Sequence, residues 1–120
     1  MNKRDAGTRR EILASEYLTS QGMRIVEHNF RSRQGEIDII GYHDGYLVFV
    51  EVRYRSTERQ GSAASTVDIR KQRRICRVSD YYRYVHRIGE EYPVRYDVVA
   101  FQGTELQWIQ NAFMHIYARG

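Results

Sequence analysis

Apolar and polar positions along the chain predict a β-hairpin at its centre. Two apolar, β-branched runs, at residues 35–40 and 47–53, flank the dipeptide Asp44-Gly45, which is typical of a two-residue hairpin turn. The second run is apolar on both faces until Glu51, as is usual for a strand in the middle of a covered sheet. We therefore expect a helix on each side of this hairpin.

Two segments outside the hairpin have the spacing of amphipathic helices. The first is predicted over residues 8–21, with Gly22 placed to end it. The second is predicted to begin with a hydroxyl N-cap within residues 65–68 and to run to about residue 86. The predicted apolar positions are Ile12, Leu13, Tyr17 and Leu18 in the first helix, and Ile75, Val78, Tyr82 and Val85 in the second.

The remaining segments predict further strands around the hairpin. Residues 23–30 predict a strand before it, and residues 94–101 and 105–109 predict two strands after the second helix. A strand, a crossover helix and another strand favour parallel pairing, so we expect the strand at 94–101 to lie beside the second hairpin strand. Residues 111–117 predict a short terminal helix, and residues 55–64 a mobile loop beside the hairpin.

The hairpin turn determines which residues face each other across its two strands. With a turn at residues 44 and 45, the numbers of opposed residues sum to 89, so that Asp38 faces Glu51 and Arg53 lies two positions farther on the same face. Opposed like charges destabilise a sheet, whereas two carboxylates can hold Mg²⁺ or Mn²⁺. The alternative is that one carboxylate pairs with Arg53 while the other faces water at a strand end.

Composition and charge narrow the class of protein. The 120 residues, 42% hydrophobic and including ten tyrosines, suffice for one globular domain over residues 1–120. A net charge of +4 is compatible with a polyanionic partner. The single cysteine excludes an internal disulfide framework, and the four scattered histidines match no zinc-site spacing. With neither an apolar leader nor a membrane-spanning run, we expect a cytoplasmic protein without a membrane partner.

The second predicted helix has a basic face and one inward-facing lysine. Lys71 points along the apolar arc, with Gln72 on its flank. Such a lysine either extends its ammonium to the rim or delivers it into the site. Four arginines occupy the i, i+3, i+4 and i+7 positions of one face. This face is either a solvated surface or a binding surface that attracts phosphates in a salt-sensitive way. These are Arg70, Arg73, Arg74 and Arg77.

The hairpin motifs Gly-Glu-Ile-Asp-Ile-Ile and Leu-Val-Phe-Val-Glu-Val-Arg resemble the YraN family of small bacterial proteins, within the PD-(D/E)XK nuclease-like superfamily. The likeness extends to Glu11 and to residues 63–72, 95–101 and 108–113. It implies an α/β fold with a restriction-endonuclease-like αβββαβ core, in which helices flank a mixed β-sheet. It also implies metal-dependent phosphodiester hydrolysis. The metal ligands that the resemblance implies are Asp38, Glu51 and, as a third acid, Glu11.

One position departs from the superfamily pattern. Lysine is expected two residues after the second acid, and Arg53 stands there instead. Lysine can orient or deprotonate the attacking water, whereas arginine keeps its proton at any ordinary pH. Arg53 can still hold the scissile phosphate and offset charge in the transition state. Proton removal would then fall to metal-bound water or to Lys71. Arginine also occurs here within the family, so the change does not by itself indicate an inactive enzyme.

The sequence therefore predicts a cytoplasmic bacterial nuclease that uses Mg²⁺ or Mn²⁺ to hydrolyse DNA. Branched or damaged DNA is the candidate substrate because the superfamily includes junction resolvases, and a homodimer is compatible with cutting both strands. The basic face would bind backbone phosphates with little base specificity. Two alternatives stay open: a non-catalytic nucleic-acid-binding module that keeps the fold, and a scaffold whose tyrosine-rich surface contacts a protein. The predicted catalytic residues are Asp38, Glu51, Arg53, Lys71 and Gln72.

Overall fold

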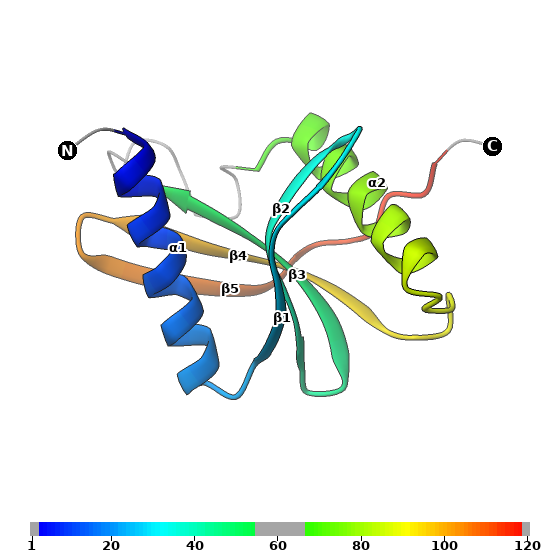
Figure 1. Cartoon of the computed structure of the whole chain (residues 1–120), viewed down its shortest axis with the longest axis horizontal. Coiled ribbons are helices and arrows are strands. Elements are labelled where there is room, and N and C mark those ends of the chain that lie inside the picture. Colours follow the sequence, from blue (N-terminus) through cyan, green and yellow to red (C-terminus); the bar gives the residue numbers. More distant parts are fainter. Residues whose placement is uncertain (1–2, 55–66, 119–120) are drawn as a thin grey trace.

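The structure is a computed structural model that describes residues 3–54 and 67–118. A five-stranded mixed sheet lies between two helices, in the αβββαβ order with one further strand (Figure 1). The elements are α1 (Lys3–Ser20), β1 (Arg24–Ser32), β2 (Gly35–His43), β3 (Tyr46–Tyr54), α2 (Ile69–Val85), β4 (Val94–Gln102) and β5 (Glu105–Phe113). Neither described helix is long and apolar enough to cross a membrane.

The strand order in the sheet follows the chain, β1-β2-β3-β4-β5. β3 and β4 pair in parallel and the other neighbours are antiparallel, which confirms the predicted crossover through α2. The predicted hairpin register is confirmed from the turn as far as the pair Ile39–Val50. Asp44 and Gly45 have φ values of 51° and 82°, the positive values that a two-residue turn of this kind requires.

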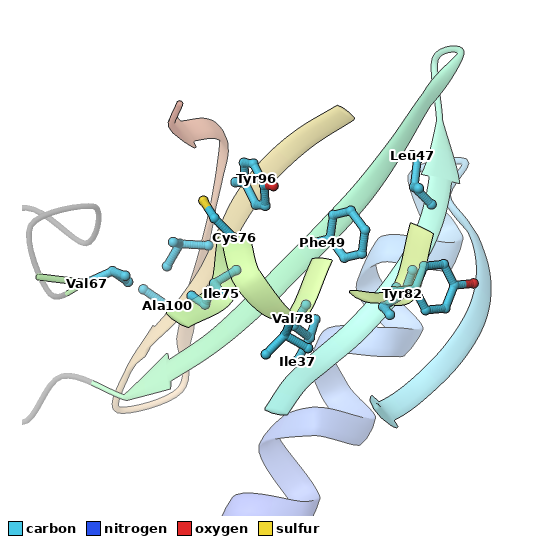
Figure 2. Packing of buried hydrophobic residues seen from close by; sticks show 12 residues of the cluster. Ile37, Leu47, Phe49, Val67, Ile75, Cys76, Val78, Tyr82, Tyr96 and Ala100 are labelled. Carbon is cyan, nitrogen blue, oxygen red and sulfur yellow. The ribbon is translucent and has the colours of Figure 1, made fainter. Parts of the chain in front are cut away.

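Each face of the sheet packs its own hydrophobic core, as the two-sided apolar pattern of β3 predicts. On one face α2 covers a cluster that includes Phe49 and Ile37, and Figure 2 shows side chains from α2 directed at these strands. On the other face, Val48 and Val50 belong to the cluster beneath α1. The central strands are therefore anchored from both sides, and this gives the strand ends beyond them a defined position.

α1 buries a narrower face than the sequence predicts. Ala14 and Leu18, one turn apart, are fully buried, whereas Ile12 and Leu13 are each 52% exposed. Ile12 and Leu13 of the predicted apolar stripe therefore lie outside the buried face of α1. On an α-helix they lie about 200° and about 100° around the axis from Ala14, so they cannot share its contact with the sheet. The helix stops as predicted at Gly22, whose φ of 98° favours glycine.

α2 begins directly after Asp68, whose carboxylate accepts a hydrogen bond from the Lys71 backbone N–H at 2.8 Å. The N-cap is thus this aspartate, and the predicted hydroxyl cap is wrong, because the first helical residue is Ile69. Three of the four predicted core positions of α2 are buried (Figure 2). The fourth, Val85, is 48% exposed because it is the last helical residue and lies beyond the core.

β5 continues to Phe113, so the predicted helix over residues 111–117 is wrong. Asn111 takes a left-handed φ of 54°, and its backbone N–H donates to Asp97 at 2.9 Å. The pairing with β4 shifts at this irregularity and then resumes, which allows the Phe113 ring to stack on Tyr96 at 5.1 Å. The loop predicted over residues 55–64 lies outside the described residues.

Candidate functional site

The pairing between β2 and β3 stops before the far ends of the two strands, and Asp38 lies at this point, which we call the fork. The last paired residues are Ile39 and Val50, and beyond them the Asp38 carboxylate accepts a hydrogen bond from the Val52 backbone N–H at 2.8 Å. A side chain thus takes the place of a backbone acceptor. The predicted face-to-face pair of Asp38 and Glu51 is therefore not a ladder pair, although the two carboxylates are close enough to repel each other.

The Asp38 carboxylate is held in an unfavourable environment. Burial, followed by repulsion from Glu51, raises the pKa of Asp38 from its ordinary value of 3.8 to about 7. The hydrogen bond from Val52 lowers this pKa, while Glu11 and Glu36 raise it further. The fork therefore concentrates negative charge where water solvates it poorly. A bound cation would relieve both the repulsion and the loss of solvation.

Three carboxylates from two elements converge at the fork. Glu11 of α1 and Glu36 and Asp38 of β2 each place one oxygen so that all three atoms lie within 4.8 Å of one another. The structure thus brings together Glu11 and Asp38, as predicted, and adds Glu36, which the sequence analysis missed. The signal was present, because residues two apart on a strand point to the same face. Arg31 of β1 contacts Glu36 at 2.7 Å.

Glu51 faces cations. Its Oε1 atom lies 3.0 Å from Nζ of Lys71 and 4.0 Å from Nη1 of Arg53. Burial raises the pKa of Glu51, and Lys71 and Arg53 act in the opposite direction. Lys71 therefore does face inward, as its position on the apolar arc predicts. Asp68 helps to place it by capping the first turn of α2.

These side chains line a pocket of about 210 Å³. Its lining combines carboxylates from β2 and β3 with cationic groups from α2, and its volume is enough for several water molecules. Anionic and cationic groups in one pocket suit a ligand that carries both signs of charge, such as a phosphate with its counter-cation. The charged lining residues are Glu36, Asp38, Glu51, Lys71 and Arg74.

The other predicted site residues lie around this pocket. Gln72 does not line it, since its Nε2 atom donates to the Val67 carbonyl oxygen at 3.0 Å, at the start of α2. The four arginines of the predicted basic face are all exposed along α2, and one of them, Arg74, also lines the pocket. The basic face therefore begins at the pocket and continues along the helix away from it.

The donor set fits a hard divalent cation. The described lining residues include three carboxylates and no histidine or cysteine, and the carboxylate of Glu11 lies beside them. Carboxylate oxygens are the ligands that Mg²⁺ and Mn²⁺ prefer. Glu11, Glu36 and Asp38 are the residues placed to hold such an ion together. Glu51 is closer to the ammonium of Lys71 than the other acids are, so it contributes charge balance on the opposite flank.

Comparisons with known proteins identify the family of this chain. The model of a family described as "Uncharacterised protein family UPF0102" matches residues 10–101. A UPF0102 protein of Lachnoclostridium phytofermentans is 45% identical over 113 residues, covering 94% of this chain and 96% of its own. One from Methylococcus capsulatus is 44% identical and covers 88% of each chain, and one from Aeromonas hydrophila is 45% identical over 86% of this chain and 80% of its own. The resemblance to the YraN family is thereby confirmed, and the chain belongs to the UPF0102 family, which is the YraN family.

Proposed function

We propose that this protein is a metal-dependent phosphodiesterase that cleaves nucleic acid, with DNA as its substrate. One observation carries the proposal: the oxygens of Glu11, Glu36 and Asp38 converge within 4.8 Å beside a pocket that also holds the ammonium of Lys71. Such a set can bind a cation and a phosphate together. The likeness of the hairpin motifs to the PD-(D/E)XK superfamily supports the same chemistry.

The acids and the cations of the pocket have separate roles in this proposal. Glu11, Glu36 and Asp38 would hold Mg²⁺ or Mn²⁺, which when bound polarises a phosphoryl oxygen and lowers the pKa of a coordinated water. Val52 orients Asp38 through its backbone N–H, which leaves the second carboxylate oxygen available. Because Asp38 is hydrogen-bonded to the backbone of β3, its position does not depend on a flexible rotamer.

Lys71 and Arg53 would bind the scissile phosphate. The ammonium of Lys71 has three N–H donors, and Glu51 at 3.0 Å takes one of them, so that the others can contact a phosphate oxygen. Arg53 lies 4.0 Å from the same carboxylate, on the flank of Glu51. In this arrangement Glu51 positions two cations, and they offset the charge that develops on the phosphoryl oxygens.

Cleavage of labelled DNA tests the proposal. Purified protein would be incubated with single-stranded, duplex and branched substrates in Mg²⁺, Mn²⁺ or EDTA. We expect metal-dependent cutting that Glu11→Gln and Asp38→Asn abolish. Matched controls are Glu16→Gln, an exposed glutamate on the same helix, and Asp44→Asn, at the hairpin turn, and both should cut like the wild type. Wild-type protein that cuts no substrate in either metal would contradict the proposal.

A non-catalytic nucleic-acid-binding module is the second candidate. The presence of Arg53 at the position where the superfamily has lysine favours it, because arginine cannot act as a proton acceptor. In this case Asp38→Asn would leave affinity for DNA unchanged or raise it, since the variant removes negative charge near the phosphates. Salt-sensitive binding without cleavage by the wild type is the result that distinguishes this candidate from the nuclease.

A further inference from the structure

The outer face of α2 continues beyond its arginines as an aromatic surface. Tyr81 and Tyr84 lie on the same helical face as Arg70, Arg74 and Arg77, at the positions that follow them at intervals of three or four residues. The side chain of Tyr81 is 46% exposed and that of Tyr84 is 81% exposed. A single helix face is thus basic near the acidic pocket and aromatic toward its C-terminal end.

A second pocket, of about 480 Å³, opens at the aromatic end of α2. Tyr84 lines it from α2, and Tyr117, 79% exposed, lines it from the segment after β5. The distance along the helix from Lys71 to Tyr84 is roughly 20 Å at 1.5 Å per residue. Two large aromatic side chains exposed at one pocket are unusual on a surface that contacts only water.

The wall of this second pocket contains a donor that lacks an acceptor. Arg83 gives its Nη2 hydrogen to the Gly89 carbonyl oxygen at 2.7 Å, but its buried Nε atom finds no hydrogen-bond partner among the described residues. This Nε atom has almost no solvent-exposed surface, so a ligand in the pocket can reach it only if the Arg83 side chain moves. Beside it, Asp80 and His115 contact each other at 3.3 Å and add polar groups to the same wall.

We propose that this second pocket binds an unpaired nucleobase of a single-stranded segment whose phosphates follow the arginines of α2. Tyr84 and Tyr117 would stack on the base, and a movement of the Arg83 side chain would let its Nε atom donate to an acceptor on the edge of the base. Every base has a π-face and hydrogen-bond acceptors, so the pocket would tolerate different bases. Paired bases are stacked inside a duplex, and a regular duplex would therefore reach the arginines without filling the pocket.

This inference deepens the proposed function, since it assigns to the same protein a substrate with unpaired bases roughly 20 Å from the acidic pocket. A nucleic acid bound at both places would have a single-stranded part on the tyrosines and its scissile phosphate at Lys71. The junction between single strand and duplex, as found at branches, flaps and gaps, is the class of structure that satisfies both. The basic and aromatic halves of α2 thus select different features of one ligand.

Fluorescence anisotropy of labelled oligonucleotides in EDTA tests the inference. The probes are oligo-dT and a blunt hairpin duplex. We expect Tyr84→Ala and Tyr117→Ala each to weaken oligo-dT binding by about tenfold, as removal of one stacking partner does, and to leave the salt dependence of binding unchanged. Arg77→Ala should weaken both probes and reduce the salt slope for oligo-dT by about 0.7. Tyr17→Ala, on α1, is the control and should bind both probes like the wild type.

A spectroscopic signal adds a direct readout of stacking. In Tyr84→Trp, the indole introduced at the pocket should lose fluorescence when oligo-dT binds, beyond any change of Trp108, the tryptophan already in the chain. Either of two results with the wild type or Tyr84→Trp would overturn the inference: no binding of oligo-dT, or no quenching of the indole fluorescence when it binds. It would also be overturned if the tyrosine-to-alanine variants bound oligo-dT like the wild type, or if they lost as much affinity for the duplex as for oligo-dT.

The two proposals fail in different ways. If Asp38→Asn and the wild type both bind oligo-dT through Tyr84 but neither cuts DNA in metal, the nuclease proposal is wrong and the base-binding pocket stands. If the wild type cuts DNA in metal while Tyr84→Ala binds oligo-dT like the wild type, the pocket is wrong and the nuclease stands.

Discussion

Asp38→Asn should stabilise the metal-free protein at pH 8, although it removes a group from the centre of the candidate site. In the wild type the Val52 N–H donates to the Asp38 carboxylate at 2.8 Å, and asparagine keeps a side-chain oxygen that can accept this hydrogen bond. It removes the negative charge that burial and Glu51 oppose. The perturbation therefore separates the electrostatic cost of this residue from its structural contact.

The magnitude follows from the shifted pKa. The pKa of Asp38 rises from 3.8 to about 7, so that between these values the folded protein binds more protons than the unfolded chain. The free energy of unfolding then falls as pH rises through this window, and the full penalty applies above pH 7. A shift of this size corresponds to about 4 kcal/mol with the Val52 hydrogen bond already included, and burial of the asparagine NH2 group offsets about 1 to 2 kcal/mol of it. We expect a net gain of about 2 kcal/mol at pH 8.

Thermal unfolding in EDTA measures this gain. For a domain of 120 residues, 2 kcal/mol corresponds to a rise in Tm of about 8 °C. The Tm of the variant should exceed that of the wild type at pH 8, and the difference should shrink toward pH 4, close to the unfolded-state pKa of 3.8, where ionisation no longer opposes folding. Asp44→Asn, at the exposed hairpin turn, should show no such dependence. A Tm equal to or below that of the wild type at pH 8 would refute the reasoning.

Four further substitutions test the packing. Asp97→Ala removes the carboxylate that lies 2.9 Å from the buried guanidinium of Arg95 and leaves that charge uncompensated. Urea denaturation should show a loss of about 3–5 kcal/mol, and a loss below about 1 kcal/mol would contradict this. Gly41→Ala would place a Cβ 2.9 Å from a backbone oxygen of β1, so calorimetry should record a loss of about 1–3 kcal/mol in the free energy of unfolding. An unchanged Tm would show that the two strands can move apart without cost. Ile12→Ser, at a 52% exposed position, should change the free energy of unfolding by no more than about 0.5 kcal/mol, whereas Leu18→Ala, at a buried position, should lower it by about 2–5 kcal/mol. Equal effects of the two substitutions would mean that α1 packs differently.

The hairpin could be predicted from the sequence because its information is local. The dipeptide Asp44-Gly45 specifies the turn, and the turn specifies the register as far as Ile39 and Val50. Apolar residues on both faces of β3 then require cover on both sides, which the two helices supply. The chain between β3 and β4 is long enough for a crossover, so the parallel pairing follows as well.

The errors concern features that depend on contacts distant in sequence. Ile12 and Leu13 look like core residues by hydropathy, but α1 buries Ala14 and Leu18 against the sheet, and its Tyr17 ring contacts Trp108 of β5. Asn111 suggests a turn or helix start, yet its N–H is satisfied by Asp97 on the neighbouring strand, which allows β5 to continue. No local pattern contains these contacts, so periodicity alone could not have anticipated them.

The same distinction applies to the acids. Strand periodicity could have placed Glu36 beside Asp38, and a strict hairpin register did place Glu51 opposite Asp38. The fork was not predictable, because it arises when the Asp38 side chain accepts the Val52 N–H in place of a ladder carbonyl. With the ladder ended, Glu51 is available to Lys71, which comes from a helix that begins 18 residues later in the chain, at Ile69.

The position of Lys71 changes how Arg53 is interpreted, two residues after the second acid of the motif. The superfamily pattern has a lysine there, beside the second acid, and a substitution by arginine looks like the loss of a catalytic group. In this fold, however, an ammonium does lie beside the second acid: Nζ of Lys71 is 3.0 Å from Glu51, nearer than the guanidinium of Arg53 at 4.0 Å. The ammonium beside the second acid therefore comes from Lys71 of α2, whereas in the superfamily pattern it comes from the same strand as that acid. If the protein is a nuclease, Lys71→Ala should reduce cleavage more than Arg53→Lys does, because the first removes the ammonium and the second adds another.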